Sequence, residues 1–314
     1  MPLLRNFFNL MSDRITIIGA GAWGGALAGL TEINGYAPTI WSRSNDRILA
    51  NDVCDRVAII SAVSMAGVRE VIDRLQDKIE PHQIIVTATK GLDAQTNSTP
   101  AQLWHTAFPA NPIVVLSGPN LSLEIQQGLP AATVVASTDI TAATQIQAIF
   151  SSPTFRVYTN DDPVGVEIAG TVKNTIAIAA GTCDGLKLGN NAKSALLTRG
   201  LAEIIRIGQY WGAKTETFYG LSGLGDLLTT CNSPLSRNYQ VGYGLAQGKT
   251  LSEVLVDLKG TAEGINTTRV LIQIANQNQI YMPITVLVDR LLYGQITAEE
   301  AIMALMLRDR KAEY

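Results

Sequence analysis

A single lysine in a long apolar stretch is the residue of this chain best suited to proton chemistry. Lys173 is the only charged residue between positions 168 and 182. Removal from water lowers the pKa of an ammonium toward neutrality, and the adjacent Asn174 could orient a hydroxyl or carbonyl oxygen. Helical spacing puts small residues on the same face, which would leave room in a cleft: Ala169, Gly170, Ala177 and Ala180. The alternative is a lysine whose stem follows a core helix while its ammonium reaches water.

Other acid–base groups are scarce. The two histidines, His82 and His105, are expected in polar connections rather than at strand ends, so histidine catalysis and a Ser-His triad are not expected. No spacing of His, Cys, Asp or Glu is typical of a zinc site, and no metal is expected. The three cysteines, Cys54, Cys183 and Cys231, are odd in number and widely spaced. They predict no disulfide framework and favour a cytoplasmic, reducing location.

Two polar motifs follow Lys173. Residues 220–226 are rich in glycine and end in Asp226, which such a turn could bring close to a polyol or to the lysine; a plain helix cap is the alternative. Ser236, Arg237 and Asn238 are expected in a polar loop whose donors suit a phosphate, although the residues alone favour an exposed turn. Arg199 and Glu203 lie four residues apart, the spacing of a pair on a helix surface.

A glycine-rich turn near the chain start predicts a dinucleotide site. Residues 14–18 are largely apolar and are expected to form a strand, and residues 22–30 are expected to form a helix. Between and within them, Gly19, Gly21 and Gly24 follow the G-x-G-x-x-G order, which allows a tight turn, close approach of a pyrophosphate and close helix–strand packing. The amino terminus of the helix offers N–H groups to the phosphates. A glycine-rich turn in another α/β domain is the alternative.

The second strand, residues 38–43, bears on the choice of cofactor. In a dinucleotide domain its end meets the adenosine ribose, where an acidic residue usually favours NAD. This chain has Trp41, Ser42 and Arg43 there, and a guanidinium suits a 2′-phosphate. NADP(H) is therefore expected to be accepted and preferred over NAD(H). The alternative is an exposed surface arginine.

The remaining pattern predicts two domains. Apolar strands at 57–63, 84–91, 112–120, 133–137 and 155–158 alternate with short helices such as 68–75, which is typical of a doubly wound parallel sheet of the Rossmann type. Gly19, Lys90 and Gly118 fall at the carboxyl ends of strands, where such sheets bind ligands. The later helices are expected at 164–180, 192–211, 251–258, 267–277 and 298–308, the last with a capping box from Thr297 and Glu300. We therefore expect a frayed tail at 1–13, a dinucleotide-binding domain at 14–160 and a mostly α-helical domain at 161–314.

Composition narrows the class of protein. The chain has 314 residues, of which 46% are hydrophobic and 16% charged, which suits a globular enzyme with a large core. A net charge of −3 and few aromatic residues argue against a nucleic-acid partner. No apolar run has the length of a membrane span, so membrane insertion is not expected.

Taken together, several motifs resemble the bacterial biosynthetic NAD(P)-dependent glycerol-3-phosphate dehydrogenases. The similarity begins near residue 14 and continues to the carboxyl terminus. The matching stretches are 19–28, 89–92, 116–119, 165–174, 198–203, 220–227, 236–238 and 262–264. Val-Lys-Asn, Gly-Leu-Gly-Asp and Ser-Arg-Asn, in this order and spacing, are the most specific of them.

The resemblance implies an oxidoreductase that reduces dihydroxyacetone phosphate to sn-glycerol 3-phosphate for glycerophospholipid synthesis. It implies that Lys173 is the proton donor and acceptor, with Asp226 orienting it and the substrate. It implies substrate contacts at these positions: Lys90, Gly118, Asn120, Lys173, Asn174, Asp226, Ser236, Arg237 and Asn238. It implies cofactor contacts beyond the three glycines at these: Ala22, Trp23, Arg43, Lys90, Ser122, Arg237 and Glu263. The resemblance also suggests a homodimer.

This sequence departs from the family pattern at two places. Asn120 stands where the family usually has a serine, and residues 44–56 replace a longer stretch that normally lies near the cofactor. Two alternatives stay open, the first because of its similar two-domain build and the second because of the shorter stretch. One is a related two-domain NADP-dependent dehydrogenase of hydroxyacids or ketopantoate, and the other is an NADP(H)-binding sensor without turnover.

Overall fold

The chain folds into two compact units in the computed structural model, which describes residues 14–45, 47–258, 260–310 and 312. The first unit contains the residues up to Thr89 and Pro100–Pro163; the second contains Lys90–Thr99 and the residues from Val164 onward. The ten residues Lys90–Thr99 therefore belong to the second unit, although the segments before and after them belong to the first. The tail expected at 1–13 lies outside the described residues.

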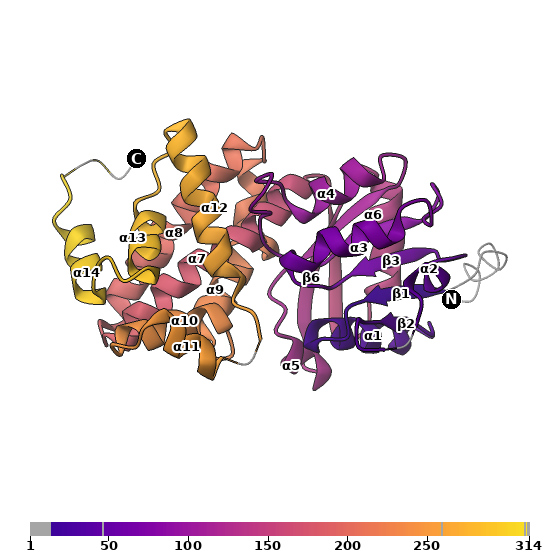
Figure 1. The fold of residues 1–314 in the computed structure, drawn as a ribbon, viewed down its shortest axis with the longest axis horizontal. Helices are drawn as coiled ribbons and strands as arrows, with labels where there is room; N and C mark the ends of the chain where they lie inside the picture. The colour runs from indigo at the N-terminus through magenta and orange to yellow at the C-terminus, as the bar shows by residue number, and fades with distance from the viewer. Residues whose placement is uncertain (1–13, 46, 259, 311, 313–314) are drawn as a thin grey trace. The chain divides into compact units, whose positions relative to one another are not determined.

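The first unit is built around a seven-stranded sheet in the order β2-β1-β3-β4-β5-β6-β7 (Figure 1). Its strands are β1 (Ile15–Ile18), β2 (Thr39–Trp41), β3 (Ala58–Ser61), β4 (Ile84–Thr87), β5 (Ile113–Ser117), β6 (Ala131–Ala136) and β7 (Phe155–Asn160). The four central strands are buried at nearly every position, as expected of a sheet covered on both faces. This confirms the α/β class and the Rossmann-type arrangement.

One strand pair differs from the expected parallel sheet. β6 is antiparallel to β5, whereas β6 and β7 are parallel. The chain between β5 and β6 contains only the short helix α5 (Ser122–Gln126), whose last residue donates from Gln126 Nε2 to the carbonyl of Ala22 in α1 at 3.1 Å. Because α5 is held at the start of α1 and does not cross a face of the sheet, β6 runs antiparallel to β5.

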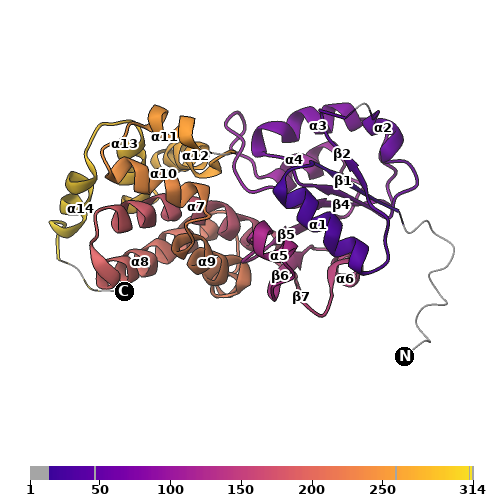
Figure 2. The same ribbon diagram turned by 90° about the horizontal axis from the view of Figure 1, so that it is seen from below.

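Helices cover both faces of this sheet (Figures 1 and 2). Helix α1 (Ala22–Ile33) and helix α6 (Ile140–Phe150) share one apolar cluster with inward residues of the strands. The opposite face packs against α2 (Leu49–Asp52), α3 (Val68–Leu75) and α4 (Pro100–Ala107), with a 3₁₀ turn at Met65–Gly67. The stretch at 44–56 contains a single helical turn, α2, whose Asp52 carboxylate binds Arg47 at 2.7 Å.

The second unit is helical and is centred on α7 (Pro163–Gly185), which is buried along almost its whole length. The other helices are α8 (Gly189–Tyr210), α9 (Asp226–Asn232), α10 (Arg237–Ala246), α11 (Leu251–Asp257), α12 (Glu263–Asn278), α13 (Pro283–Leu292) and α14 (Ala298–Met306). Helix α10 crosses α7 at backbone distance, since a Cβ on Gly242 would lie 1.8 Å from the carbonyl oxygen of Ile178. The capping box of Thr297 and Glu300 is present at the start of α14.

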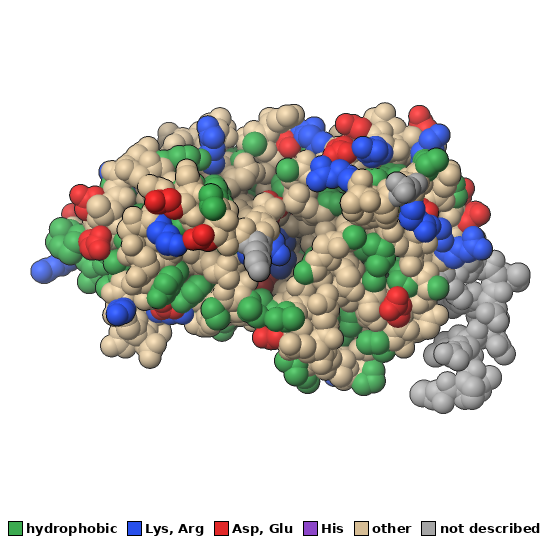
Figure 3. All heavy atoms as spheres, turned by 60° about the horizontal axis from the view of Figure 1, so that its bottom comes forward, with side chains coloured by type: hydrophobic (Ala, Val, Ile, Leu, Met, Phe, Trp, Pro, Cys, Tyr) green, Lys and Arg blue, Asp and Glu red, His purple; other side chains and the backbone are tan. Residues whose placement is uncertain are grey.

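The surface of the described residues carries charges of both signs, which are interspersed on the face drawn in Figure 3. Hydrophobic side chains gather at the end that belongs to α14, where Met306 and Leu307 are 75% and 76% exposed. Within the described residues, no helix combines the length and the apolar character needed to cross a membrane.

Candidate active site

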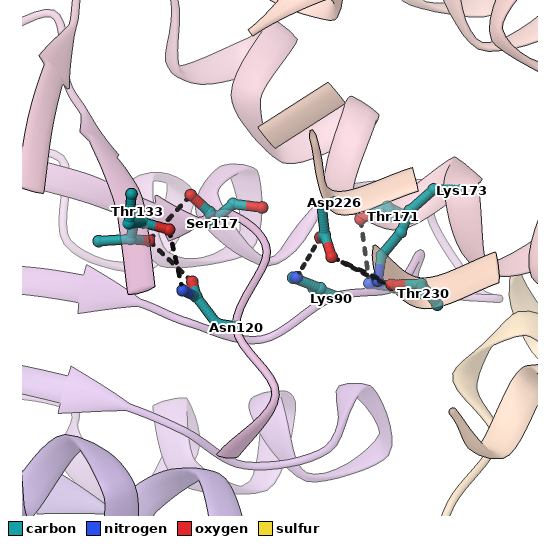
Figure 4. Close-up of polar contacts among 10 residues, drawn as sticks. Lys90, Ser117, Asn120, Thr133, Thr171, Lys173, Asp226 and Thr230 are labelled. Atoms are coloured by element: carbon teal, nitrogen blue, oxygen red, sulfur yellow. Dashed lines mark hydrogen bonds and ion pairs between the residues drawn. The ribbon is translucent and has the colours of Figure 1, made fainter. Parts of the chain in front are cut away.

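Lys173 lies in the middle of α7, and its ammonium is held by groups of the second unit (Figure 4). Its Nζ is 2.9 Å from Asp226 Oδ1 and donates a hydrogen bond to Thr230 Oγ1. The residue is only 5% exposed. The lysine therefore does not extend along the helix to bulk water. The neighbouring small residues Ala169, Ala177 and Ala180 belong to the core of the unit, so they allow helix packing and do not leave a cleft.

Asp226 is placed by an unusual local backbone. Residues Leu221–Gly225 form one turn of π-helix, and Asp226 begins α9 directly after it. The turn packs tightly, since a Cβ on Gly223 would lie 2.1 Å from the carbonyl oxygen of Phe218. One turn further along α9, the Thr230 hydroxyl donates to Asp226 Oδ1 at 3.1 Å. The glycine-rich motif thus brings Asp226 to the lysine, and Asp226 is more than the cap of a helix.

Lys90 binds the same carboxylate from a different segment. Its Nζ donates to Asp226 Oδ2 at 2.6 Å, and its side chain is 24% exposed. Strand β4 ends at Thr87, so Lys90 lies three residues beyond the strand, in the segment Lys90–Thr99 that belongs to the helical unit. Two ammonium groups therefore share one buried carboxylate.

Burial and charge set the proton affinities of this cluster in opposite directions. Burial lowers the pKa of Lys173 from the ordinary 10.5 to about 8; Asp226 partly opposes that shift, while the positive charge of Lys90 adds to it. Burial would raise the pKa of Asp226, but Lys173 and Lys90 together hold it below its usual value. The buried Cys231 thiol beside them has its pKa raised to about 12, chiefly by burial, and stays protonated. The cluster can thus hold a proton on Lys173 that is released near neutral pH.

The glycine turn in the first unit has the geometry of a phosphate cradle. Gly19 has φ of +119°, and a Cβ on Gly24 would lie 1.8 Å from the carbonyl oxygen of Gly19. In contrast, a Cβ on Gly21 would meet no atom within 4 Å, so open space lies above the turn. Gly21 is the N-cap of α1, which has no side-chain cap and no acidic residue in its first turn. Ala22 and Trp23 begin this helix. These features fit the pyrophosphate of a dinucleotide.

The other expected cofactor contacts of this unit lie around the same sheet. Arg43 follows β2; its side chain is 74% exposed and its Nη1 is 3.4 Å from Glu70 Oε2. Beside it, the hydroxyls of Ser42 and Ser44 are 3.0 Å apart. Ser122 is the first residue of α5. An exposed guanidinium with adjacent hydroxyls is a donor set that fits a 2′-phosphate.

Gly118 and Asn120 follow β5 and contact β6. A Cβ on Gly118 would lie 2.9 Å from the Cα of Thr133. The Asn120 amide donates to the carbonyl of Ala132 at 3.2 Å and accepts from Thr133 Oγ1 at 2.8 Å (Figure 4). The Asn120 side chain is therefore anchored by the protein itself.

Ser236, Arg237 and Asn238 do not form a loop, contrary to the expectation. Ser236 is the N-cap of α10 and accepts from the Tyr239 N–H at 3.3 Å, and Arg237 and Asn238 are the first residues of the helix. Asn238 Oδ1 accepts from the Gly264 N–H at 2.9 Å, next to Glu263 at the start of α12. Arg237 is exposed and donates to the carbonyl of Thr261 at 3.2 Å.

The start of α12 also lies against α7, because a Cβ on Gly264 would be 2.8 Å from the carbonyl oxygen of Asn174. Asn174 itself is buried beside Lys173. The beginnings of α10 and α12 therefore converge on the part of α7 that carries the Lys173–Asn174 pair.

For three further residues, the structure differs from the sequence-based expectation or shows a contact that the expectation did not include. Thr230 was not singled out, although its position four residues after Asp226 on a helix is the signal that could have found it. Glu203 is 2% exposed and accepts from the Ile284 N–H at 2.6 Å and the Thr285 N–H at 3.1 Å, so it is not a helix-surface residue but caps α13. His105 lies on the exposed side of α4 instead of in a connection. Among the residues that the structure describes, no three His, Cys, Asp or Glu side chains are grouped to hold a metal ion.

A glycine-turn α/β unit joined to a helical unit with a buried lysine–carboxylate cluster defines the class of two-unit, dinucleotide-dependent dehydrogenases. Models of one family in this class match most of the chain: the NAD-dependent glycerol-3-phosphate dehydrogenase N-terminus over residues 49–143, and the corresponding C-terminus over residues 162–303. The chain belongs to the NAD-dependent glycerol-3-phosphate dehydrogenase family.

Individual relatives agree with this family. The chain is 61% identical to a protein of Trichormus variabilis named glycerol-3-phosphate dehydrogenase [NAD(P)+], over 97% of this chain and 100% of that protein. It is 34% identical to the crystal structure of glycerol-3-phosphate dehydrogenase from Coxiella burnetii, with a TM-score of 0.89 over 94% of this chain and 99% of that one. A ketopantoate reductase from Ralstonia eutropha shares the fold alone, at 13% identity and a TM-score of 0.58 over 92% of this chain and 99% of that one.

Proposed function

We propose that this chain catalyses reversible hydride transfer between NAD(P)H and dihydroxyacetone phosphate, which yields sn-glycerol 3-phosphate. The observation that carries the proposal is the ammonium of Lys173, buried on Asp226 and with a pKa lowered to about 8. Such a group can give a proton to a reduced carbonyl oxygen and take it back near neutral pH. Membership of the family and the names of the relatives support the choice of substrate.

In the reducing direction, bound NAD(P)H supplies a hydride to the carbonyl carbon. Lys173 Nζ donates its proton to the carbonyl oxygen as negative charge develops there, so that the C=O becomes CH–OH and the lysine is left neutral. Asp226 and Thr230 hold Nζ in one place, which orients the proton before the reaction. Solvent then returns the proton to the lysine, and the oxidation follows the same steps in reverse.

The remaining residues would bind and orient the substrate. Arg237, at the exposed start of α10, would hold the phosphate together with Ser236 and Asn238, because a guanidinium next to a helix amino terminus is a strong anion site. Lys90 would add a second cation close to Lys173. In addition, Asn174 would orient the hydroxyl of the substrate, and the family resemblance assigns further substrate contacts to Gly118 and Asn120.

For the cofactor, we propose that Gly19, Gly21 and Gly24 hold the pyrophosphate with Ala22 and Trp23 at the start of α1. The family resemblance assigns the further contacts to Ser122, Lys90, Arg237 and Glu263. We propose a preference for NADP(H), supported by the exposed Arg43 beside two serine hydroxyls.

The biological setting is also part of the proposal. The product would supply glycerophospholipid synthesis. Three free cysteines, of which Cys54 is exposed, favour a reducing cytoplasm. A homodimer is also part of the proposal, on the family resemblance, and a measurement of the molar mass in solution tests it.

A spectrophotometric assay tests the reaction. Folded protein is expected to oxidise NADPH, and NADH more slowly, with dihydroxyacetone phosphate but not with 2-oxo or 3-oxo acids. Lys173→Met should lower kcat by roughly 10²–10⁴-fold. The matched control is Lys193→Met, which removes a lysine that binds Asp184 at 2.6 Å elsewhere in the unit and should leave kcat near wild type.

Three results would contradict the proposal. Consumption of neither coenzyme by folded wild-type protein would favour a binding sensor. Turnover of an oxo acid instead would favour the related hydroxyacid or ketopantoate dehydrogenases. Full activity of Lys173→Met would remove the lysine from the mechanism.

A further inference from the structure

The segment that carries Lys90 is fastened to the helical unit at two adjacent residues. The Gly91 N–H donates to Thr171 Oγ1 of α7 at 3.2 Å, and the carbonyl of Leu92 accepts from Asn266 Nδ2 of α12 at 2.8 Å. The Leu92 side chain is fully buried in the core of the same unit. Three consecutive residues thus contribute an ammonium, an N–H and a carbonyl to contacts with α9, α7 and α12.

This fastening matters because Lys90 lies outside the helices and strands, although the preceding Thr89 is held by its hydroxyl, which donates to the carbonyl of Val63 at 2.9 Å. Residues 88–93 form no helix or strand, and Gly91 has φ of +146°, a conformation that side chains rarely adopt. A long flexible lysine keeps its ammonium 2.6 Å from Asp226 Oδ2 only if its backbone is fixed. Lys90–Thr99 belongs to the helical unit. Within that unit, residues 91 and 92 are fixed by their contacts with α7 and α12, and the Asp93 N–H donates to the carbonyl of Ser98 at 2.8 Å inside the segment.

We propose that Thr171 and Asn266 are positioning residues that act through Lys90. They fix the 90–92 backbone so that the Lys90 ammonium stays on Asp226, next to the proton-donating Lys173. This inference rests on the function proposed above. It assigns a role in the reaction to two side chains that are not among the residues expected to contact substrate or cofactor.

The charges around Lys173 give the proposal a specific signature. The groups that face its ammonium are Asp226, Thr230 and Cys231 of α9 and, through Asp226, Lys90. The positive charge of Lys90 lowers the pKa of Lys173. If the 90–92 backbone loosens and Lys90 leaves Asp226, the pKa of Lys173 therefore rises.

The key variant is Thr171→Val, which keeps the shape of the side chain and removes the acceptor. We expect kcat/KM for dihydroxyacetone phosphate to fall about tenfold, equivalent to about 1.4 kcal/mol, and the alkaline limb of its pH profile to move upward. Thr171→Ser should restore both to near wild type. Asn266→Ala should resemble Thr171→Val, and Thr171→Val should have no added effect in a Lys90→Ala background.

Thr175→Val is the matched control. Thr175 lies one turn along the same helix, and its hydroxyl binds that of Thr268 in α12 at 2.9 Å, fully buried. Its substitution also removes a buried interhelical hydrogen bond, so stability should fall comparably. It should leave the pH profile unchanged, since it does not contact the 90–92 segment.

Several results would overturn the proposal: equal pH shifts in Thr171→Val and Thr175→Val, no rescue by serine, or additive losses with Lys90→Ala. A titration of the Lys173 side chain by ¹³C-lysine NMR, with the resonance assigned by its loss in Lys173→Met, follows the same pKa without turnover. If wild-type protein does not reduce dihydroxyacetone phosphate, the proposed function fails. The NMR shift between wild type and Thr171→Val still decides the positioning role.

Discussion

Replacement of Asp226 by asparagine should change the pH dependence of the reaction in a direction that the structure fixes. Asp226 Oδ1 is 2.9 Å from Lys173 Nζ. Even at the dielectric constant of bulk water, unit charges about 3 Å apart attract by about 1.4 kcal/mol, which is roughly one pKa unit. Asp226→Asn removes this attraction and leaves the repulsion of Lys90. The pKa of Lys173 should therefore fall from about 8 by about one unit or more.

The measurement is kcat/KM for dihydroxyacetone phosphate across pH, because this ratio reports the ionisations of the free enzyme. In the proposed mechanism, reduction needs the protonated lysine, so the rate should be level at low pH and decline as pH rises through the pKa of Lys173. The alkaline decline should begin at lower pH in Asp226→Asn than in wild type. For the oxidation, which needs the neutral amine, the rise should also begin at lower pH.

A matched control separates this effect from general damage. Asp184 accepts from Lys193 at 2.6 Å and from the Tyr239 hydroxyl at 2.8 Å in the same unit. Asp184→Asn should therefore weaken packing without moving the alkaline limb. A limb that stays in place or moves upward in Asp226→Asn would refute the assignment of that limb to a Lys173 held by Asp226.

Four further substitutions test other parts of the molecule. Gly21→Val should leave the unfolding midpoint unchanged, because its Cβ meets open space, yet lower nucleotide affinity at least tenfold in a fluorescence titration; Gly24→Ala should instead destabilise the fold, since its Cβ would lie 1.8 Å from a carbonyl oxygen. Arg43→Ala should weaken NADPH binding by about tenfold, or about 1.4 kcal/mol, and leave NADH binding unchanged; equal losses for both coenzymes would contradict a 2′-phosphate contact. Glu203→Ala leaves two buried N–H groups of α13 without their acceptor and should lower the free energy of unfolding in urea by roughly 3 kcal/mol at unchanged kcat/KM.

Elements with a clear local pattern were predictable from the sequence. Helix α3 has the predicted bounds, 68–75, because its apolar residues recur at helical spacing and are the ones buried. Helix α13 was not predicted: its Ile284, Thr285 and Val286 are β-branched, and its first N–H groups are satisfied by Glu203, about eighty residues away in sequence. The reversed direction of β6 was missed for a similar reason, since it depends on the distant contact of α5 with α1.

The candidate site shows the same division between local and distant information. Lys173 could be singled out because it is the lone charge in an apolar helix, and that signal is local. Its partners could not be deduced from spacing: Lys90 and Asp226 are 136 residues apart, and Lys90 was expected at a strand end of the first unit, whereas it belongs to the second. The resemblance to a family named these residues, but it did not predict that two of them share one carboxylate.

That sharing has a chemical consequence. Two ammonium groups on one buried carboxylate leave a net charge of +1 in a region with little water, which is costly until an anion arrives. A neutral ketone would not compensate that charge, whereas the phosphate of a phosphorylated ketone is negatively charged. During reduction of the ketone, further negative charge develops on the carbonyl oxygen. The excess charge also lowers the pKa of Lys173, so the same arrangement that favours an anionic substrate makes the proton easier to transfer.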